Sequence, residues 1–171
     1  WNALPNLASS DRDLTPAIII DVDDTVLDNS PYEARLIKSG KSYPSGWGDW
    51  CNESQAKPLP GVLEFLLKAE QMGAKIFYVT NRKYEYEKGT LENFKKFGIP
   101  IEGDEDSLLM RYENGWDSNK TSRRELIAKN HRVIFQIGDN LGDFVDLSLS
   151  HQSPEKRVEV VTEFNNMWGK Y

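Results

Sequence analysis

The sequence predicts an α/β fold in which a doubly wound parallel sheet is flanked by helices, with a small cap of loop and helix. Three short apolar runs, at residues 17–20, 75–79 and 131–137, have the length and branched side chains of buried strands. Segments with apolar residues at helical spacing lie between the runs. Strands that alternate with helices form parallel sheets, so the three runs are expected in one sheet.

The first part of the chain is expected to hold one strand, one helix and a long loop. Residues 1–16, rich in Asn, Ser, Asp and Pro, predict an irregular lead-in to the strand. After the strand, Asn29-Ser30-Pro31 resembles a helix cap followed by a first-turn proline, and a helix over 32–38 should end at Gly40. The prolines and glycines of residues 42–60 predict a loop, which also holds three aromatic residues.

The rest of the chain continues the alternation of helices and strands. Glycines after apolar periodic segments mark the expected helix ends. The expected elements are, in chain order, a helix from Pro60 to Gly73, the strand 75–79, a helix with Leu91, Phe94 and Phe97 on one face, a weaker strand (107–112), a helix (118–129), the strand 131–137 and a final strand (158–164).

Composition bounds the class of protein. The 171 residues suffice for one domain with a real core, and 39% hydrophobic and 28% charged residues are typical of a globular chain. A net charge of −6 argues against binding to a nucleic-acid polymer. We expect no transmembrane segment, because no apolar run is long enough to span a bilayer. The single cysteine, Cys51, excludes an intramolecular disulfide.

Each strong apolar run ends in polar residues. Asp21 and Asp23 follow the first run and point to the same side of an extended chain. Parallel strands place their carboxyl ends at one edge of the sheet, which is where open α/β sheets bind ligands. The residues expected at that edge are Asp21, Asp23, Thr80, Asn81, Lys120, Asp139 and Asp143.

This set of side chains suits phosphoryl transfer. Four carboxylates in one pocket repel one another unless a cation neutralises them, and an all-oxygen ligand set favours Mg²⁺. Thr80, Asn81 and Lys120 are donors suited to the oxygens of a phosphoryl group. A carboxylate can act as a nucleophile that forms an aspartyl-phosphate, and a neighbouring carboxylate can exchange protons with the leaving group and with water.

Four motifs carry a resemblance to a known family. They are Asp21-Val22-Asp23-Asp24-Thr25, Val79-Thr80-Asn81-Arg82, Lys120 and Gly138-Asp139-Asn140-Leu141-Gly142-Asp143. In this order they resemble the motifs of the haloacid dehalogenase (HAD) superfamily of phosphatases. Together with Asp28-Asn29-Ser30-Pro31-Tyr32, they are similar to the class C non-specific acid phosphatases of bacteria, which are lipoprotein-type or secreted enzymes. The resemblance covers most of the chain, from about Pro16 to Phe144, and is expected to extend to Tyr171.

The resemblance implies a role for each acid. Asp21 would be the nucleophile and a Mg²⁺ ligand. Asp23 would be the general acid and base, and its backbone carbonyl would touch the metal. Asp139 would be the third protein ligand of the metal, and Asp143 would orient Asp139 or a metal-bound water.

The same resemblance implies how substrate is held. Thr80, Asn81 and Lys120 would bind the phosphoryl group. Trp47 matches a position where the family stacks an aromatic ring on the substrate, often on a nucleobase. Arg82 is expected either to contact substrate or to serve helix entry. The expected substrates are small phosphomonoesters, including nucleoside 5′-monophosphates.

The expected organisation is a single HAD-like domain over residues 1–171. Its core spans about 16–40 and 58–171, and a cap-like insertion spans about 41–57. The family resemblance implies a bacterial enzyme that is periplasmic, secreted or anchored to the outer membrane. The oligomeric state is not predicted.

Two alternative functions remain open. The first is a receiver-type signalling domain, which uses similar residues. The second is a truncated HAD domain with little turnover, because family members usually continue past Trp168 into a further strand and an aromatic tail.

Structural roles are expected for the remaining polar and aromatic residues of interest. These are Asp24 and Asp28 in turns or caps, Trp50 in packing, and Arg123 and Arg124 on a solvated helix face.

Overall fold

The computed structural model describes residues 14–101, 106–148 and 153–168. Most of the predicted lead-in therefore lies outside the described residues. Within the described part, the sheet has four parallel strands in the order β3-β2-β1-β4. The strands are β1 (Pro16–Ile20), β2 (Lys75–Lys83), β3 (Leu108–Arg111) and β4 (Arg132–Ile137). The predicted parallel sheet flanked by helices is confirmed.

The described residues form six α-helices, and none of them is long and apolar enough to cross a bilayer. They are α1 (Ser30–Ser39), α2 (Trp47–Glu53), α3 (Val62–Gln71), α4 (Glu87–Phe97), α5 (Thr121–Asn130) and α6 (Pro154–Trp168).

The central strand β1 separates two hydrophobic clusters. Ile18 and Ile20 pack with residues of α3 and α4, such as Leu66 and Phe94. Ala17 and Ile19 point to the other face and pack with residues that include Ile127 of α5. Alternate residues of a strand face opposite sides, so an unbroken apolar run fills both layers at once. Burial of β1 on both faces fixes its carboxyl end in the middle of the sheet edge.

Residues 80–83 continue β2 rather than ending it, contrary to the expected end of the strand at residue 79. The pairing with β3 shifts register between Val79 and Lys83. Along this extended stretch Thr80 and Arg82 are buried, whereas Asn81 is exposed. The alternation of a strand therefore sends Thr80 and Arg82 to one side and Asn81 to the other.

The predicted final strand over residues 158–164 is wrong, because this segment lies in α6. The backbone N–H of Lys156 donates to Ser153 Oγ at 3.3 Å, which caps the start of the helix. Val160 is buried, and the Phe164 ring lies 5.3 Å from the ring of Phe144. Val160 and Phe164 are four residues apart, close to one turn of a helix, and Pro154 suits the first turn of α6.

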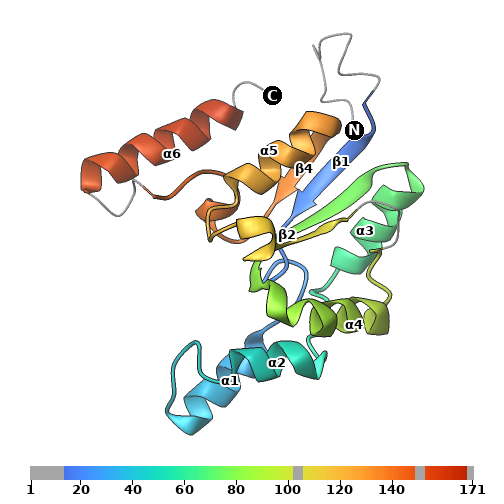
Figure 1. Cartoon of the computed structure of the whole chain (residues 1–171), viewed down its shortest axis with the longest axis vertical. Coiled ribbons are helices and arrows are strands. Elements are labelled where there is room, and N and C mark those ends of the chain that lie inside the picture. The colour runs from blue at the N-terminus through green and yellow to red at the C-terminus, as the bar shows by residue number, and fades with distance from the viewer. Residues whose placement is uncertain (1–13, 102–105, 149–152, 169–171) are drawn as a thin grey trace.

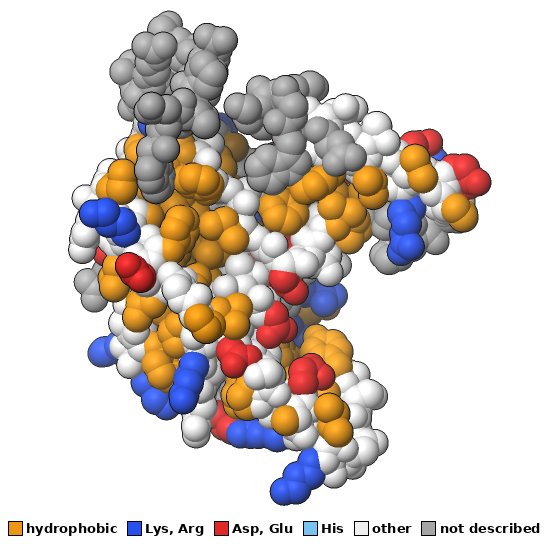
Figure 2. All heavy atoms as spheres, turned by 180° about the vertical axis from the view of Figure 1, so that it is seen from behind, with side chains coloured by type: hydrophobic (Ala, Val, Ile, Leu, Met, Phe, Trp, Pro, Cys, Tyr) orange, Lys and Arg blue, Asp and Glu red, His pale blue; other side chains and the backbone are white. Residues whose placement is uncertain are grey.

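An insertion that contains α1 and α2 leaves the sheet through a narrow stem. Asp28 N donates to Lys57 O at 2.8 Å and Leu59 N donates to Val26 O at 2.9 Å, so the two chain segments pair where the insertion begins and ends. The residues between them include α2, where the sequence had predicted a loop. Seen from behind, the molecule is hollowed between α6 and this insertion, and acidic side chains lie at the inner side of the hollow (Figure 2).

The helix α2 rests on α4 at a glycine. A β-carbon at residue 89 would lie 2.6 Å from Cys51 O and 2.8 Å from the α-carbon of Asn52, both on α2. The buried Asn93, one turn along α4, donates to Ala56 O at 2.7 Å and accepts from Ala56 N at 3.0 Å. Gly89 therefore permits a contact that fixes the insertion against the sheet domain.

We expect Gly89→Ala to destabilise the protein by about 1–3 kcal/mol, because the added methyl group forces α2 away from α4. Alanine favours helices over glycine, so a rise in stability would show that the steric conflict is absent. Urea unfolding of the variant measures the change. Lys88→Ala, at a neighbouring side chain that is 90% exposed, is the control and should leave the midpoint almost unchanged.

Candidate active site

The strand ends that the sequence singled out surround one cavity of about 540 Å³. Its lining includes seven aspartates and a single lysine, so the cavity carries a strong negative charge. These residues are Asp21, Asp23, Asp24, Asp117, Asp139, Asp143, Asp146 and Lys120. Carboxylates this close to one another favour the binding of a cation.

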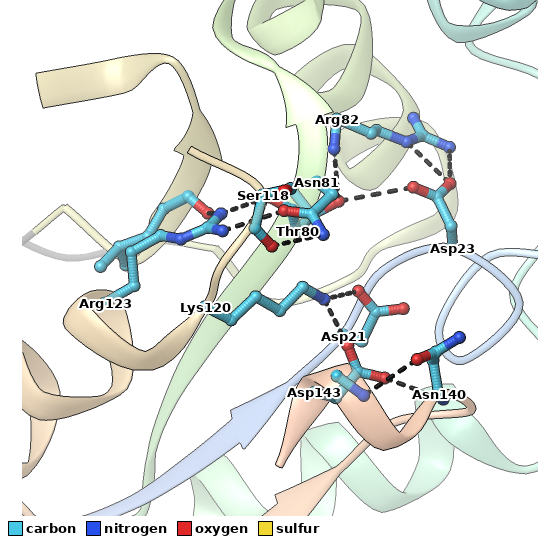
Figure 3. Close-up of polar contacts among 12 residues, drawn as sticks. Asp21, Asp23, Thr80, Asn81, Arg82, Ser118, Lys120, Arg123, Asn140 and Asp143 are labelled. Carbon is cyan, nitrogen blue, oxygen red and sulfur yellow. Dashed lines mark hydrogen bonds and ion pairs between the residues drawn. The ribbon is translucent and has the colours of Figure 1, made fainter. Parts of the chain in front are cut away.

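A buried lysine joins two of the aspartates (Figure 3). Lys120 Nζ donates to Asp21 Oδ1 and, at 2.6 Å, to Asp143 Oδ1. All three side chains are less than 10% exposed. They come from the end of β1, the residue before α5 and the turn after β4. The ionic contact therefore ties three separate elements together at the edge of the sheet.

The Asp21 carboxyl has a strongly perturbed pKa. The pKa of Asp21 is raised to about 7, chiefly by burial; the Lys120 ammonium opposes this rise, whereas Asp143 and Asp23 add to it. Burial and the nearby Asp143 also raise the pKa of Asp139. A carboxylate in this setting gains from any additional positive charge beside it.

Three carboxylates are close enough to share a metal ion. Oxygen atoms of Asp21, Asp139 and Asp143 all lie within 4.8 Å of one another. Carboxylate oxygens are the ligands that Mg²⁺ prefers, and the raised pKa values of Asp21 and Asp139 indicate that Lys120 offsets only part of the effect of burial and of the neighbouring carboxylates. The residues present therefore fit a divalent cation.

The turn after β4 holds Asp143 in place. Asp143 Oδ2 accepts from Asn140 N at 3.0 Å, and Asn140 Oδ1 accepts from Gly142 N at 2.9 Å. A β-carbon at residue 138 would lie 2.6 Å from the β-carbon of Asp143. Gly138 is therefore required for space, since the Asp143 side chain lies against its backbone.

Asp23 has a different environment from Asp21. Arg82 donates to Asp23 Oδ1 through Nε at 2.9 Å and Nη2 at 2.8 Å, and Asn29 Nδ2 donates to the same oxygen at 2.9 Å. Thr80 Oγ1 donates to Asp23 Oδ2 at 3.4 Å. The two acids are two residues apart in sequence, yet one contacts a lysine and the other a guanidinium.

Arg82 was expected either to contact substrate or to serve helix entry, and in the structure its side chain contacts other side chains of the protein. Its side chain is 1% exposed, and its remaining amino group donates to Thr90 Oγ1 at 3.2 Å. Figure 3 shows the guanidinium of Arg82 facing Asp23, and Arg82 is not among the residues that line the cavity. Thr80 is also fully buried, and its hydroxyl accepts from Arg82 N at 3.0 Å.

Asn81 faces the cavity and is positioned by a residue that the sequence analysis misjudged. Asn81 Nδ2 donates to Ser118 O at 3.0 Å, and its Oδ1 accepts from Arg123 Nη2 at 2.9 Å. Arg123 is fully buried, which corrects the expected solvated face of α5. It also donates to Thr80 O at 2.6 Å and to Asp117 O at 3.1 Å.

Burial lowers the pKa of Arg123 to about 10, so the guanidinium is charged at neutral pH and binds mainly backbone carbonyls. In sequence, Arg123 lies three residues after Lys120, hence on the same face of the helix. That spacing was the available signal for its burial. Arg124 is also partly buried, and it donates to Asp143 O at 3.0 Å.

The two tryptophans of the insertion pack mainly within it. Trp47 is half-buried, with its ring 4.9 Å from Tyr32 and 5.8 Å from Tyr43, and the Arg82 guanidinium lies 5.6 Å from the ring centre. Trp47 is not among the residues that line the cavity. Trp50 is 2% exposed and has the packing role expected of it.

The two acids assigned to structure make short-range contacts. Asp24 Oδ1 accepts from Asn29 N at 3.1 Å, and Asp28 Oδ1 accepts from Ser30 N at 2.9 Å at the start of α1. This hydrogen bonding to Ser30 lowers the pKa of Asp28. Asp24 also has a positive φ of 57°, which fits a tight turn after β1.

Comparison with known families identifies the group to which the fold and motifs belong. The family model described as HAD superfamily, subfamily IIIB (acid phosphatase), matches residues 2–168. The chain belongs to this family. The family assignment favours a phosphatase over the receiver-type signalling domain.

A solved structure and curated relatives agree with this family. The class C acid phosphatase from Bacillus anthracis is 37% identical, with a TM-score of 0.78 over 90% of this chain and 63% of that chain, and its structure with tungstate bound matches equally. Acid phosphatase 1 of Solanum lycopersicum is 25% identical over 79% of this chain and 54% of that protein.

Vegetative storage protein 1 of Arabidopsis thaliana is 24% identical over 75% of this chain and 48% of that protein. The chain spans about half the length of these curated relatives. The names of these relatives include both an enzyme and a storage protein, so similarity to them does not by itself assign an activity to this chain.

We expect Asp21→Asn to change how stability depends on pH. Without a cation, the pKa of Asp21 is raised from 3.8 to about 7 in the folded chain. The folded state then binds more protons than the unfolded state between these values, so stability is full below the lower pKa and is lost as pH rises through the upper one. The Asn variant lacks this loss.

Urea unfolding in EDTA, at about pH 4.5 and about pH 8, measures the effect. The variant should gain stability relative to the unmodified chain on going to the higher pH. An equal difference between the two proteins at both pH values would contradict the raised pKa.

Proposed function

We propose that the chain is a Mg²⁺-dependent acid phosphatase that hydrolyses small phosphomonoesters through an aspartyl-phosphate intermediate. The observation that carries this proposal is the buried Asp21 carboxylate, held by Lys120 beside the carboxylates of Asp139 and Asp143. A carboxylate held in this way is a nucleophile with its charge compensation already in place. Nucleoside 5′-monophosphates are among the proposed substrates.

In the first step, a carboxylate oxygen of Asp21 forms a bond to phosphorus while the bond from phosphorus to the leaving oxygen breaks. Asp23 gives its proton to the leaving oxygen, which departs as an alcohol. Lys120 Nζ and the side-chain amide of Asn81 are donors at the same cavity and would hold the phosphoryl oxygens. Thr80 is proposed to contribute to the same group.

In the second step, water attacks the phosphorus of the aspartyl-phosphate. Asp23, now ionised, accepts the proton of the water, and the bond from phosphorus to Asp21 breaks to release inorganic phosphate. Both steps need Asp23 close to the phosphoryl group, and its carboxyl lines the same cavity as Asp21. One residue thus gives and regains a single proton in each cycle.

The proposed cation would be held by Asp21, Asp139 and Asp143, with the backbone carbonyl of Asp23 as a further ligand. When bound, Mg²⁺ supplies positive charge that keeps Asp21 ionised and lowers the repulsion between carboxylate and phosphate. Oxygen-only ligands and the excess of acidic side chains around the cavity support this choice of metal.

The proposed organisation is one HAD-like domain with a cap over the site. The stem at residues 26–28 and 57–59 suggests that the cap begins near Asn29 and so includes α1, earlier than the expected start at residue 41. Trp47 in this cap is proposed to contact the organic part of the substrate. A periplasmic, secreted or outer-membrane location is proposed from the resemblance to class C enzymes.

The tungstate-bound structure of the Bacillus anthracis enzyme supports an oxyanion site in the family. Tungstate is a tetrahedral oxyanion like phosphate. By analogy, the phosphoryl group of a substrate is proposed to bind at the cavity of this chain.

We expect Asp21→Asn to abolish steady phosphate release from p-nitrophenyl phosphate, because an amide cannot form the acyl-phosphate bond. Asp23→Asn should lower kcat by about 10²–10⁴-fold, the usual contribution of a general acid or base. Phosphate release under saturating Mg²⁺ is the measurement. Turnover that survives in Asp21→Asn would exclude this residue as nucleophile.

A stable phosphorylated chain without turnover would instead favour the truncated-domain alternative. Mass spectrometry after mixing with substrate detects one added phosphoryl group per chain. Rapid loss of that group, matched to the rate of phosphate release, is the result that the proposed mechanism requires.

We expect EDTA to remove activity and Mg²⁺ to restore it. Isothermal titration of the chelated protein should show one Mg²⁺ site whose affinity falls in Asp139→Asn, since one charged ligand is lost. Asp146→Asn is a matched control: Asp146 lines the cavity but lies outside the group of three carboxylates, and it accepts from Ser148 N at 2.7 Å. An equal loss of Mg²⁺ affinity in Asp139→Asn and Asp146→Asn would argue against the assigned ligands.

A further inference from the structure

Asn29 lies at the start of α1, where its side chain could cap the helix, yet it makes no capping hydrogen bond. The side chain is instead 2% exposed and turned toward Asp23. Its Nδ2 donates to Asp23 Oδ1 at 2.9 Å, and its Oδ1 accepts from Trp50 Nε1 at 2.9 Å. A capping bond is worth about 1 kcal/mol, so the chain forgoes a stabilising contact at this position.

The chemistry of its two partners fixes the orientation of the Asn29 amide. An indole N–H only donates, and Asp23 Oδ1, which already accepts from Arg82, remains an acceptor whether or not Oδ2 carries a proton. The amide oxygen must therefore face Trp50 of α2, and the amide nitrogen must face Asp23. With the amide turned over, its NH₂ group would face the indole N–H and its oxygen would face the Asp23 oxygen, so neither hydrogen bond could form. The tryptophan thus selects the one orientation in which Asn29 supports Asp23.

The same contacts make the two oxygens of Asp23 unequal. Oδ1 receives three N–H groups, two from Arg82 and one from Asn29. Oδ2 accepts a hydrogen bond from the Thr80 hydroxyl at 3.4 Å, which is longer than any of the three hydrogen bonds to Oδ1. A carboxyl oxygen that already accepts three donors has no lone pair left for a proton. Oδ2 is therefore the atom able to carry one.

We propose that Asn29, oriented by the indole of Trp50, is a positioning residue that presents Oδ2 of Asp23 to the leaving group. This inference rests on the proposed function, in which Asp23 is the general acid and base. It adds that residues of the insertion orient the Asp23 carboxyl, because Asn29 lies at the stem of the insertion and Trp50 lies within α2. The packing of α2 and the orientation of Asp23 are therefore coupled.

The dependence of rate on the leaving group separates this role from a purely structural one. The alkoxide of glycerol 2-phosphate needs a proton as it leaves, whereas p-nitrophenolate leaves without one. In kcat/KM, which excludes the second step, a misplaced acid slows only the first substrate, while a loosened fold slows both. The ratio kcat/KM is the quantity to compare, because it reports the steps through departure of the leaving group.

The experiment uses Asn29→Ser, which removes the amide, and Trp50→Phe, which removes the indole N–H and keeps an aromatic ring. For Asn29→Ser we expect kcat/KM to fall about tenfold with glycerol 2-phosphate and less than about twofold with p-nitrophenyl phosphate. Trp50→Phe should show the same preference to a smaller degree, and it tests the link even if Asn29→Ser fails to fold.

Asn93→Ser is the matched control, because Asn93 is equally buried and its amide also bridges two groups, N–H and C=O of Ala56. It should slow both substrates equally or neither. Equal losses on the two substrates in Asn29→Ser and Trp50→Phe would overturn the inference, as would a leaving-group effect in Asn93→Ser.

Asp23→Asn distinguishes failure of the inference from failure of the proposed function. A leaving-group effect in Asp23→Asn without one in Asn29→Ser or Trp50→Phe overturns the positioning role alone. Absence of the effect in Asp23→Asn itself overturns the acid and base role of Asp23, and the positioning role with it.

Discussion

The burial of Lys120 between Asp21 and Asp143 is the interaction on which the edge of the sheet depends. Removing three charged groups from water is costly, and the cost is offset only by close ionic contacts among them. Losing one partner of a buried ion pair typically costs about 3–5 kcal/mol, because the other charge is left alone. The end of β1, the start of α5 and the turn after β4 are therefore held to one geometry.

A second buried ion pair gives the neighbouring acid a different character. The Arg82 guanidinium clamps Asp23, while Asp21 lies beside a lysine and a group of carboxylates. Two carboxyl groups in contrasting surroundings can divide the work of nucleophile and proton carrier. The alternation along β2 makes this possible, since it turns Arg82 inward to Asp23 and leaves Asn81 on the cavity.

Patterns of a few residues were enough to predict the sheet and the cluster of acids at its edge. The periodicity and composition of the sequence were enough to predict the strand before Asp21 and the position of the two acids after β4. The predictions were wrong where contacts between distant residues determine the local structure. Residues 158–164 are branched and apolar like a strand, yet a cap at Ser153 and packing of Phe164 on Phe144 make them helical. From the sequence alone, Arg123 resembles a surface residue. In the fold its guanidinium is buried and donates to five carbonyl and amide oxygens, some of them from distant parts of the chain.

Gly138 illustrates a constraint that chemistry alone would overlook. The residue has no reactive group, and its value lies in the volume it leaves to the Asp143 side chain. Residues 138 and 143 therefore cannot be substituted independently, because any side chain at position 138 displaces the carboxylate at position 143. A library of substitutions across this turn would find the inert glycine as intolerant of change as the acid that it accommodates.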